Sequence, residues 1–158
     1  MEGLIPREFG DDAVEIPGAR ALLDSLNDAN ALWGVVTSGT KPLVTGWLEV
    51  LKLPMPENLV TAESVDNGKP DPKCYLLGKE KIGLKDTKGD ILVLEDAPAG
   101  IRAGKAAGCK VLGLATTHSV DHVVAAGADW VVKDLKSVRL VDGGKDGVRL
   151  EFKDTLVR

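Results

Sequence analysis

Two adjacent acids, Glu95 and Asp96, are the residues best suited to chemistry. They follow the apolar run 91–94 and precede the sequence Ala-Pro-Ala-Gly at 97–100, where a helix is expected to begin. A buried strand would therefore deliver two carboxylates to its C-terminal tip, the edge at which open α/β sheets bind ligands. Because Mg²⁺ is a hard cation that prefers oxygen ligands, we predict that Glu95 and Asp96 are metal ligands. The alternative, in which Asp96 caps the helix and Glu95 is solvated, is weaker, because an acidic pair buried at a sheet edge needs a compensating positive group.

A second candidate is the sequence Thr-Ser-Gly-Thr at 37–40, which follows another apolar run, 31–36. A hydroxyl group at the end of a strand can donate to a phosphate oxygen, and the N–H groups of the next turn lie at the positive end of a helix dipole. We therefore predict that Thr37, Ser38 and Gly39 bind phosphate, and Thr37 is also a candidate catalytic residue. Taken alone, the sequence is more typical of ordinary helix capping near Lys41, because hydroxyl caps are common.

The third candidate is Lys69, within the sequence Gly-Lys-Pro-Asp-Pro at 68–72. Two prolines and a glycine restrict the backbone around this lysine. An ammonium group fixed in this way could neutralise a phosphate group and the carboxylate that attacks it, so Lys69 is a candidate catalytic and phosphate-binding residue. The alternative is a solvated lysine in a proline-rich turn.

Alternating helices and strands must position these three candidates. Apolar periodicity and turn residues predict helices opening at Pro17, near Pro42, at Pro72, at Pro98 and at Ser119. The same patterns predict strands at 31–36, 59–60, 91–94, 110–114 and 130–132. This alternation predicts an α/β fold with right-handed crossovers and a mostly parallel sheet.

The C-terminal part of the chain follows a different pattern. Apolar segments 138–141 and 148–152 flank a turn rich in glycine and aspartate, which predicts a β-hairpin. We therefore divide the chain into a lead at 1–16, an α/β core at 17–135 and a hairpin extension at 136–158.

Composition excludes several classes of function. The net charge is −4 with acidic and basic residues interspersed, which argues against a nucleic-acid-binding surface. No apolar stretch is long enough for a membrane span, and no signal peptide is evident. Cys74 and Cys109 form no metal-spaced cluster, so reduced thiols in a cytoplasmic protein are expected. His118 and His122 are expected at the surface.

The order of hydroxyl group, lysine and acidic pair at successive strand ends resembles the haloacid-dehalogenase-like hydrolases. The resemblance extends from about residue 16 to residue 135. Thr37 matches the second motif of that family, Lys69 the third, and Glu95 with Asp96 the fourth. The longer strings at 35–40, 68–70, 95–101 and 104–109 are similar to those of fungal glycerol-phosphate and 2-deoxyglucose-6-phosphate phosphatases.

The resemblance implies a Rossmann-like, three-layer αβα core that uses Mg²⁺ to hydrolyse a small sugar or polyol phosphate. Family members attack phosphorus with an aspartate from an Asp-x-Asp-Gly-Thr/Val segment that ends the first strand, a form of covalent catalysis. No such segment is found here. The pair Asp11 and Asp12 is the only acidic pair before Thr37, and it lacks a preceding apolar strand. The resemblance therefore begins in the final stretch of the cap that family members insert after their first motif.

In the family the missing strand lies between the strand ending at Thr37 and the strand ending at Glu95. Without it, two strand edges would carry unpaired N–H and C=O groups. We expect that the two strands pair directly, that a strand-donating or homo-oligomeric partner fills the gap, or that the chain is poorly stable.

Three functional interpretations remain. In the first, the chain is a truncated sugar- or polyol-phosphate phosphatase, inactive alone because a covalent nucleophile is lacking. In the second, it is a non-catalytic remnant that binds phosphate or a partner protein, so whether it is an enzyme stays open. The third, an unrelated Rossmann-like binding module, is weakest, because no Gly-x-Gly-x-x-Gly sequence follows the first strand.

Overall fold

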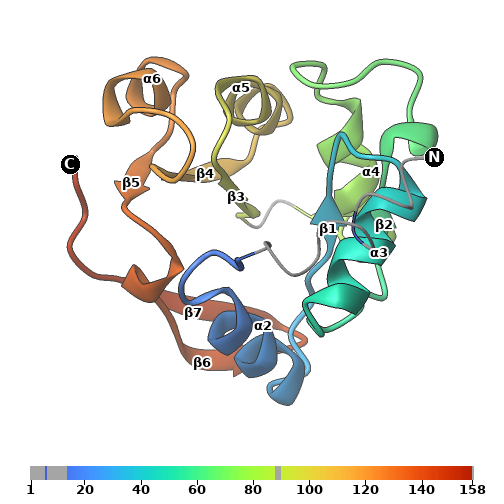
Figure 1. The fold of residues 1–158 in the computed structure, drawn as a ribbon, viewed down its shortest axis with the longest axis horizontal. Helices are drawn as coiled ribbons and strands as arrows, with labels where there is room; N and C mark the ends of the chain where they lie inside the picture. Colours follow the sequence, from blue (N-terminus) through green and yellow to red (C-terminus); the bar gives the residue numbers. More distant parts are fainter. Residues whose placement is uncertain (1–5, 7–13, 88–89, 158) are drawn as a thin grey trace.

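The computed structural model describes residues 6, 14–87 and 90–157. Figure 1 shows its elements, which follow one another in this order: α2 (Ala19–Asp28), β1 (Val35–Val36), α3 (Lys41–Val50), β2 (Leu59–Val60), η3 (Ala62–Ser64), α4 (Lys73–Lys81), β3 (Leu92–Glu95), α5 (Pro98–Ala106), β4 (Lys110–Leu114), α6 (Val120–Ala125), β5 (Trp130–Val132), η4 (Leu135–Ser137), β6 (Val138–Gly144) and β7 (Gly147–Phe152). The predicted α/β alternation and the C-terminal hairpin are confirmed. Most of the predicted lead at 1–16, with Asp11 and Asp12, lies outside the described residues.

The parallel strands form two separate sheets. β3, β4 and β5 form one sheet in that order, and β1 pairs with β2 in the other. The strand expected at 31–36 is ordered as β only at Val35–Val36, because its partner β2 offers only Leu59–Val60 for pairing. β3 extends one residue beyond the prediction, to Glu95, which lies opposite Gly113 of β4.

Two apolar clusters cover the two faces of the larger sheet. Figure 1 shows α5 and α6 on one side of this sheet and α2 with the hairpin on the other. The first packs α4, α5 and α6 against the sheet through residues such as Tyr75, Ile101 and Val111. The second joins the sheet to α2 and the hairpin through Leu22, Leu112 and other side chains. This arrangement places helices on one face and α2 together with the hairpin on the other. Within the described residues, no helix is long and apolar enough to cross a membrane.

The hairpin is longer than predicted and is part of the second apolar cluster. β6 and β7 pair up to Gly144 and Gly147, so the turn is two residues long. Gly147 has a φ of 147°, a conformation that favours glycine. The Phe152 ring packs edge-on against Trp130 with centroids 5.4 Å apart. The proposed boundaries at 16/17 and 135/136 stay predictions.

The facing edges of β1 and β3 have no strand partner among residues 14–87 and 90–157 and are called open edges below. The N–H groups of Val35 and Thr37 donate to the carbonyl oxygens of Asn58 and Val60. The N–H group of the intervening Val36 therefore points to the opposite edge of β1. In the same way, the register of β3 directs the N–H group of Val93 toward β4 and the N–H group of Leu94 toward the edge away from β4. No strand in the described part of the chain pairs with either edge, so β1 and β3 do not pair directly, one of the three alternatives expected from the sequence.

Asp129 joins three segments by hydrogen bonds at the N-terminal ends of β4 and β5, away from the candidate site. Its carboxylate accepts hydrogen bonds from the Lys105 ammonium group at 2.9 and 3.0 Å and from the Val111 N–H group at 2.7 Å. Burial acts to raise the pKa of Asp129, but these donors outweigh it and lower that pKa below its usual value. The interaction joins α5, β4 and the segment before β5.

Replacing Asp129 by Asn tests this contact. We expect a loss of about 1 kcal/mol in the free energy of unfolding near neutral pH, a modest value because Lys105 is partly exposed. A lowered folded-state pKa means that the contribution exists above the unfolded pKa and is lost as the pH falls through the folded pKa. The difference from the original chain should therefore shrink in acid, measured by urea denaturation. Glu151→Gln, which removes an exposed pair with Arg139, serves as the control and should change stability little. An Asp129→Asn deficit that is constant down to acid would contradict this.

Amide hydrogen exchange tests the open edges. In the isolated monomer we expect the amides of Val36 and Leu94 to exchange at least about tenfold faster than those of Val35 and Val93, because only the latter pair point into a sheet. Equal protection of alternate amides along both strands would contradict the open-edge arrangement and indicate an inserted strand.

Candidate functional site

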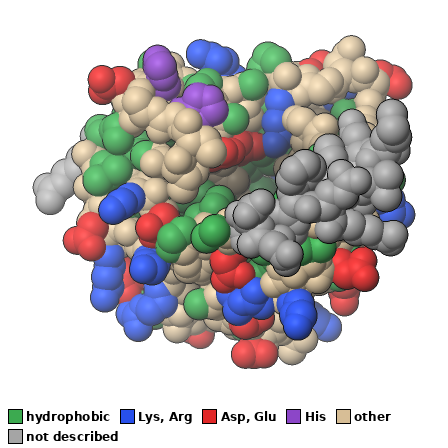
Figure 2. Space-filling view, viewed as in Figure 1, with side chains coloured by type: hydrophobic (Ala, Val, Ile, Leu, Met, Phe, Trp, Pro, Cys, Tyr) green, Lys and Arg blue, Asp and Glu red, His purple; other side chains and the backbone are tan. Residues whose placement is uncertain are grey.

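A cavity of about 410 Å³ lies between the C-terminal ends of β1 and β3. Five of the six predicted site residues line it. The sixth, Gly39, is not among the lining residues and follows Ser38 in the chain. Figure 2 shows acidic side chains recessed near the centre of this face. The full lining is Val36, Thr37, Ser38, Lys69, Leu94, Glu95, Asp96, Ala97, Ala99 and Gly100. The structure thus brings together residues that lie almost 60 positions apart in the chain, as expected where parallel strands end at one edge.

Glu95 is the most constrained side chain of the site, with 7% of its surface exposed. Its Oε1 accepts hydrogen bonds from the Lys69 ammonium group and, at 2.5 Å, from the Tyr75 hydroxyl group. Its Oε2 accepts from the N–H groups of Asp96 at 3.1 Å and Ala97 at 3.3 Å, at the start of α5. The buried charge is therefore compensated by an ammonium group, a hydroxyl group and a helix N-terminus.

Tyr75 was not predicted from the sequence. Burial raises the pKa of its phenol, and the neighbouring Glu95 carboxylate raises it further, so Tyr75 stays protonated and donates to Glu95. The predicted helix start near Asp71 is the sequence signal that could have indicated Tyr75. Asp71 accepts a hydrogen bond from the Lys73 N–H group at 2.8 Å, and Tyr75 lies in the first turn of the helix that starts at Lys73, close to Lys69.

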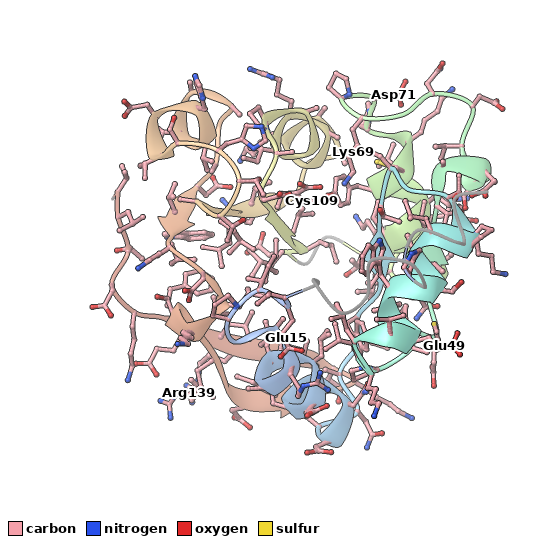
Figure 3. The ribbon with its side chains drawn as sticks, viewed as in Figure 1. Glu15, Glu49, Lys69, Asp71, Cys109 and Arg139 are labelled. Atoms are coloured by element: carbon pink, nitrogen blue, oxygen red, sulfur yellow. The ribbon has the colours of Figure 1, made fainter. Side chains whose placement is uncertain are left out.

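Lys69 links the two open strand edges. Besides Glu95 of β3, its ammonium group donates to the carbonyl oxygen of Val36 in β1 at 3.3 Å. The same nitrogen lies 5.1 Å from the centre of the Tyr75 ring, a cation–π contact. Figure 3 shows the Lys69 label between α4 and α5, above β3. The alternative of a solvated surface lysine does not hold, because only 12% of its side chain is exposed.

The turn after β1 leaves a hydroxyl proton available. The Gly39 N–H group donates to Thr37 Oγ1 at 3.1 Å, so the hydroxyl group of Thr37 can donate its own proton elsewhere. The first amide of α3, that of Lys41, donates instead to both oxygens of Glu63 at 3.1 and 3.2 Å. A hydrogen bond from Thr61 is the main cause that lowers the pKa of Glu63. Glu63, a residue that the sequence analysis did not single out, therefore caps α3 and leaves Thr37 to the cavity.

Asp96 has one oxygen engaged and one open. Its Oδ2 accepts a hydrogen bond from the Thr117 hydroxyl group at 2.6 Å, and within the described residues Oδ1 accepts none. Asp96 does not cap α5, whose N-cap is Ala97. The described part of the chain holds no group of three or more His, Cys, Asp or Glu residues that could enclose a metal ion. A single open carboxylate still fits Mg²⁺, which commonly takes one or two carboxylates together with water and phosphate oxygens.

The described residues of this arrangement suit a phosphate ester, but they offer no free carboxylate that could attack it. An ammonium group, a hydroxyl group and an open carboxylate surround one cavity, which suits a phosphate dianion with a divalent cation. Among the described lining residues the only carboxylates are those of Glu95 and Asp96. Glu95 is held by four donors and Asp96 is the metal candidate, so neither is free to act as a nucleophile.

Comparison with known proteins places the chain in context. The family model described as haloacid dehalogenase-like hydrolase matches residues 7–114. Glycerol-1-phosphate phosphohydrolase 1 of Saccharomyces cerevisiae is 42% identical over 99% of this chain and 66% of its own length. The 2-deoxyglucose-6-phosphate phosphatase 1 of the same yeast is 34% identical over 100% of this chain and 70% of its own length. The chain thus spans about two-thirds of the length of these relatives.

Solved structures support the same fold. A hydrolase from Pseudomonas syringae superposes with a TM-score of 0.75 at 30% identity, covering 84% of this chain and 64% of that protein. A putative beta-phosphoglucomutase from Thermotoga maritima has a TM-score of 0.72 at 29% identity, covering 80% of this chain and 59% of its own. The parallel α/β arrangement is therefore shared with these proteins.

Gly100 provides a test of the Glu95 contacts. A Cβ atom at this position would lie 2.1 Å from the Glu95 carboxyl carbon, so Gly100→Ala should displace Glu95 from its donors. We expect a loss of about 3 kcal/mol in the free energy of unfolding, although alanine alone would favour the helix by about 1 kcal/mol. Gly68→Ala, which adds its Cβ to open space, is the matched control and should change stability little. Equal urea midpoints for the two variants would contradict the proposed packing.

Proposed function

Because the chain belongs to the haloacid dehalogenase-like hydrolase family, we propose that it carries the phosphate- and cation-binding part of a Mg²⁺-dependent phosphatase. The proposed substrate is a small sugar or polyol phosphate monoester, the class named in the glycerol-1-phosphate and 2-deoxyglucose-6-phosphate phosphatases of yeast. One observation carries the proposal: Lys69 is buried between the ends of β1 and β3, on the cavity that also holds Thr37 and Asp96.

In this proposal Thr37 and Lys69 bind the phosphate group. The free hydroxyl proton of Thr37 and the N–H group of Ser38 would donate to phosphate oxygens, while Lys69 offsets their charge. Gly39 remains a predicted contact through the backbone, although its N–H group already donates to Thr37. Glu95 keeps the Lys69 ammonium group at the cavity wall.

Asp96 is the residue of this chain that would hold Mg²⁺, through its open Oδ1. The bound cation would supply compensation for negative charge on the phosphate oxygens. Both Glu95 oxygens already accept hydrogen bonds, which favours Glu95 as the anchor of Lys69 rather than as a direct ligand. The sequence-based prediction that both acids bind the cation is thereby narrowed to Asp96.

The attacking carboxylate must come from outside the described residues. The open edges of β1 and β3 flank the cavity and fit an additional parallel strand, which would end beside Lys69. This strand would come from a preceding segment of a longer polypeptide or from a strand-donating partner. Without it, we expect negligible turnover.

A second candidate function is non-catalytic binding of phosphate or of a partner protein. It is favoured by the same absence of a nucleophilic carboxylate from the described lining of the cavity. The two candidates differ in what an added strand would achieve, because only the first predicts turnover.

The test is to extend the chain with an N-terminal strand ending in Asp-x-Asp and with the cap of a yeast relative. We expect Mg²⁺-dependent hydrolysis of sugar or polyol phosphates, which Lys69→Ala and Asp96→Asn each lower by about 10²- to 10³-fold in kcat/KM. Lys73→Ala and Asp146→Asn remove exposed residues of the same types and should have little effect. If Lys69→Ala and Asp96→Asn leave the rate unchanged, the site assignment is wrong. An inactive extended protein that still binds inorganic phosphate would favour the second candidate.

A further inference from the structure

Two polar side chains of the loop between β4 and α6, Thr117 and His118, form a series of hydrogen bonds that ends at Asp96. Thr117 Oγ1 lies 2.6 Å from Asp96 Oδ2, and the same Thr117 oxygen lies 3.0 Å from His118 Nδ1. Thr117 and His118 are themselves exposed, so neither is held there by burial. Neither residue belongs to the motifs on which the proposed function rests.

The directions of these hydrogen bonds follow from the chemistry of the three groups. A carboxylate can only accept, so the single hydroxyl proton of Thr117 must go to Asp96. The hydroxyl oxygen of Thr117 can then only accept from His118, which requires the proton of the neutral imidazole to sit on Nδ1. Nε2 of His118 is then the unprotonated nitrogen. A free neutral histidine side chain favours the other tautomer, with the proton on Nε2.

We propose that Thr117 and His118 are positioning residues for Asp96. Together they hold Oδ2 toward the loop after β4. Within the described residues this leaves Oδ1, on a side chain that lines the cavity, without a hydrogen bond and available to a divalent cation. The functional part of this inference rests on the proposed cation role of Asp96. Hydrogen-bond partners of metal ligands typically change metal affinity by about 10- to 100-fold when they are removed.

The first experiment is NMR spectroscopy of the imidazole nitrogens in this chain at about pH 8, above the usual titration range of histidine. We expect His118 to carry its proton on Nδ1, and Thr117→Val to convert it to the Nε2–H form, because the acceptor is lost. Thr117→Ser keeps the hydroxyl group and should preserve the Nδ1–H form. His122, which lies outside this series of hydrogen bonds, is the internal reference in all three proteins. An Nε2–H tautomer in the original chain, or no change in Thr117→Val, would overturn the proposal.

The second measurement concerns the Asp96 side chain in the same samples. Scalar couplings should report one χ1 rotamer for Asp96 in the original chain and in Thr117→Ser, and averaging between rotamers in Thr117→Val. A single rotamer in all three proteins would overturn the positioning role even if the tautomer is as expected.

Titration with Mn²⁺ separates this inference from the proposed function. We expect binding near Asp96 that is about tenfold weaker in Thr117→Val than in Thr117→Ser. Equal affinities for the two variants would overturn the positioning role. If the original chain does not bind Mn²⁺ near Asp96, the proposed cation site fails, while the tautomer and the rotamer still decide whether Thr117 and His118 position the carboxylate.

Discussion

The buried carboxylate of Glu95 is the constraint on which the site depends. An ionised group with 7% exposure is tolerated only where donors replace its water. Here four donors come from Lys69, Tyr75 and the two backbone N–H groups just before α5. Satisfying this one charge places the Lys69 ammonium group, the Tyr75 hydroxyl group of α4 and the close approach of α5 at Gly100. Structural stability and the placement of the candidate chemistry therefore share the same contacts.

The same contacts set which groups the described residues present at the cavity. Lys69 reaches from Glu95 in β3 to the Val36 carbonyl oxygen in β1, across two strand edges that lack a partner in the described residues. A positive group, a hydroxyl group and an open carboxylate face the cavity between these edges. In the proposed function these groups would bind phosphate, and a further carboxylate would be needed for covalent attack.

Much of this could be predicted from the sequence, because local patterns determine it. β4 and β5 occupy the predicted residues, and the sheet edge gathers Thr37, Lys69 and the acidic pair as parallel topology requires. β1 is shorter than predicted, because strand length depends on the partner, which apolar periodicity does not report. Tyr75, Glu63 and Thr117 were missed for a related reason: each acts through a contact with a distant segment. The different surroundings of Glu95 and Asp96 were also beyond the sequence, where the two acids are simply adjacent.

The most direct test of the account is the mass of the species that carries Mg²⁺-dependent phosphatase activity. Size fractionation of the protein from its own cells, with activity and intact mass measured in each fraction, would determine it. The account predicts that activity accompanies only species larger than the 16.7-kDa chain, either a longer polypeptide or a complex that supplies the additional strand. Full activity in a 16.7-kDa monomer would contradict it, because the chain itself would then supply the nucleophile that the account assigns to an additional strand.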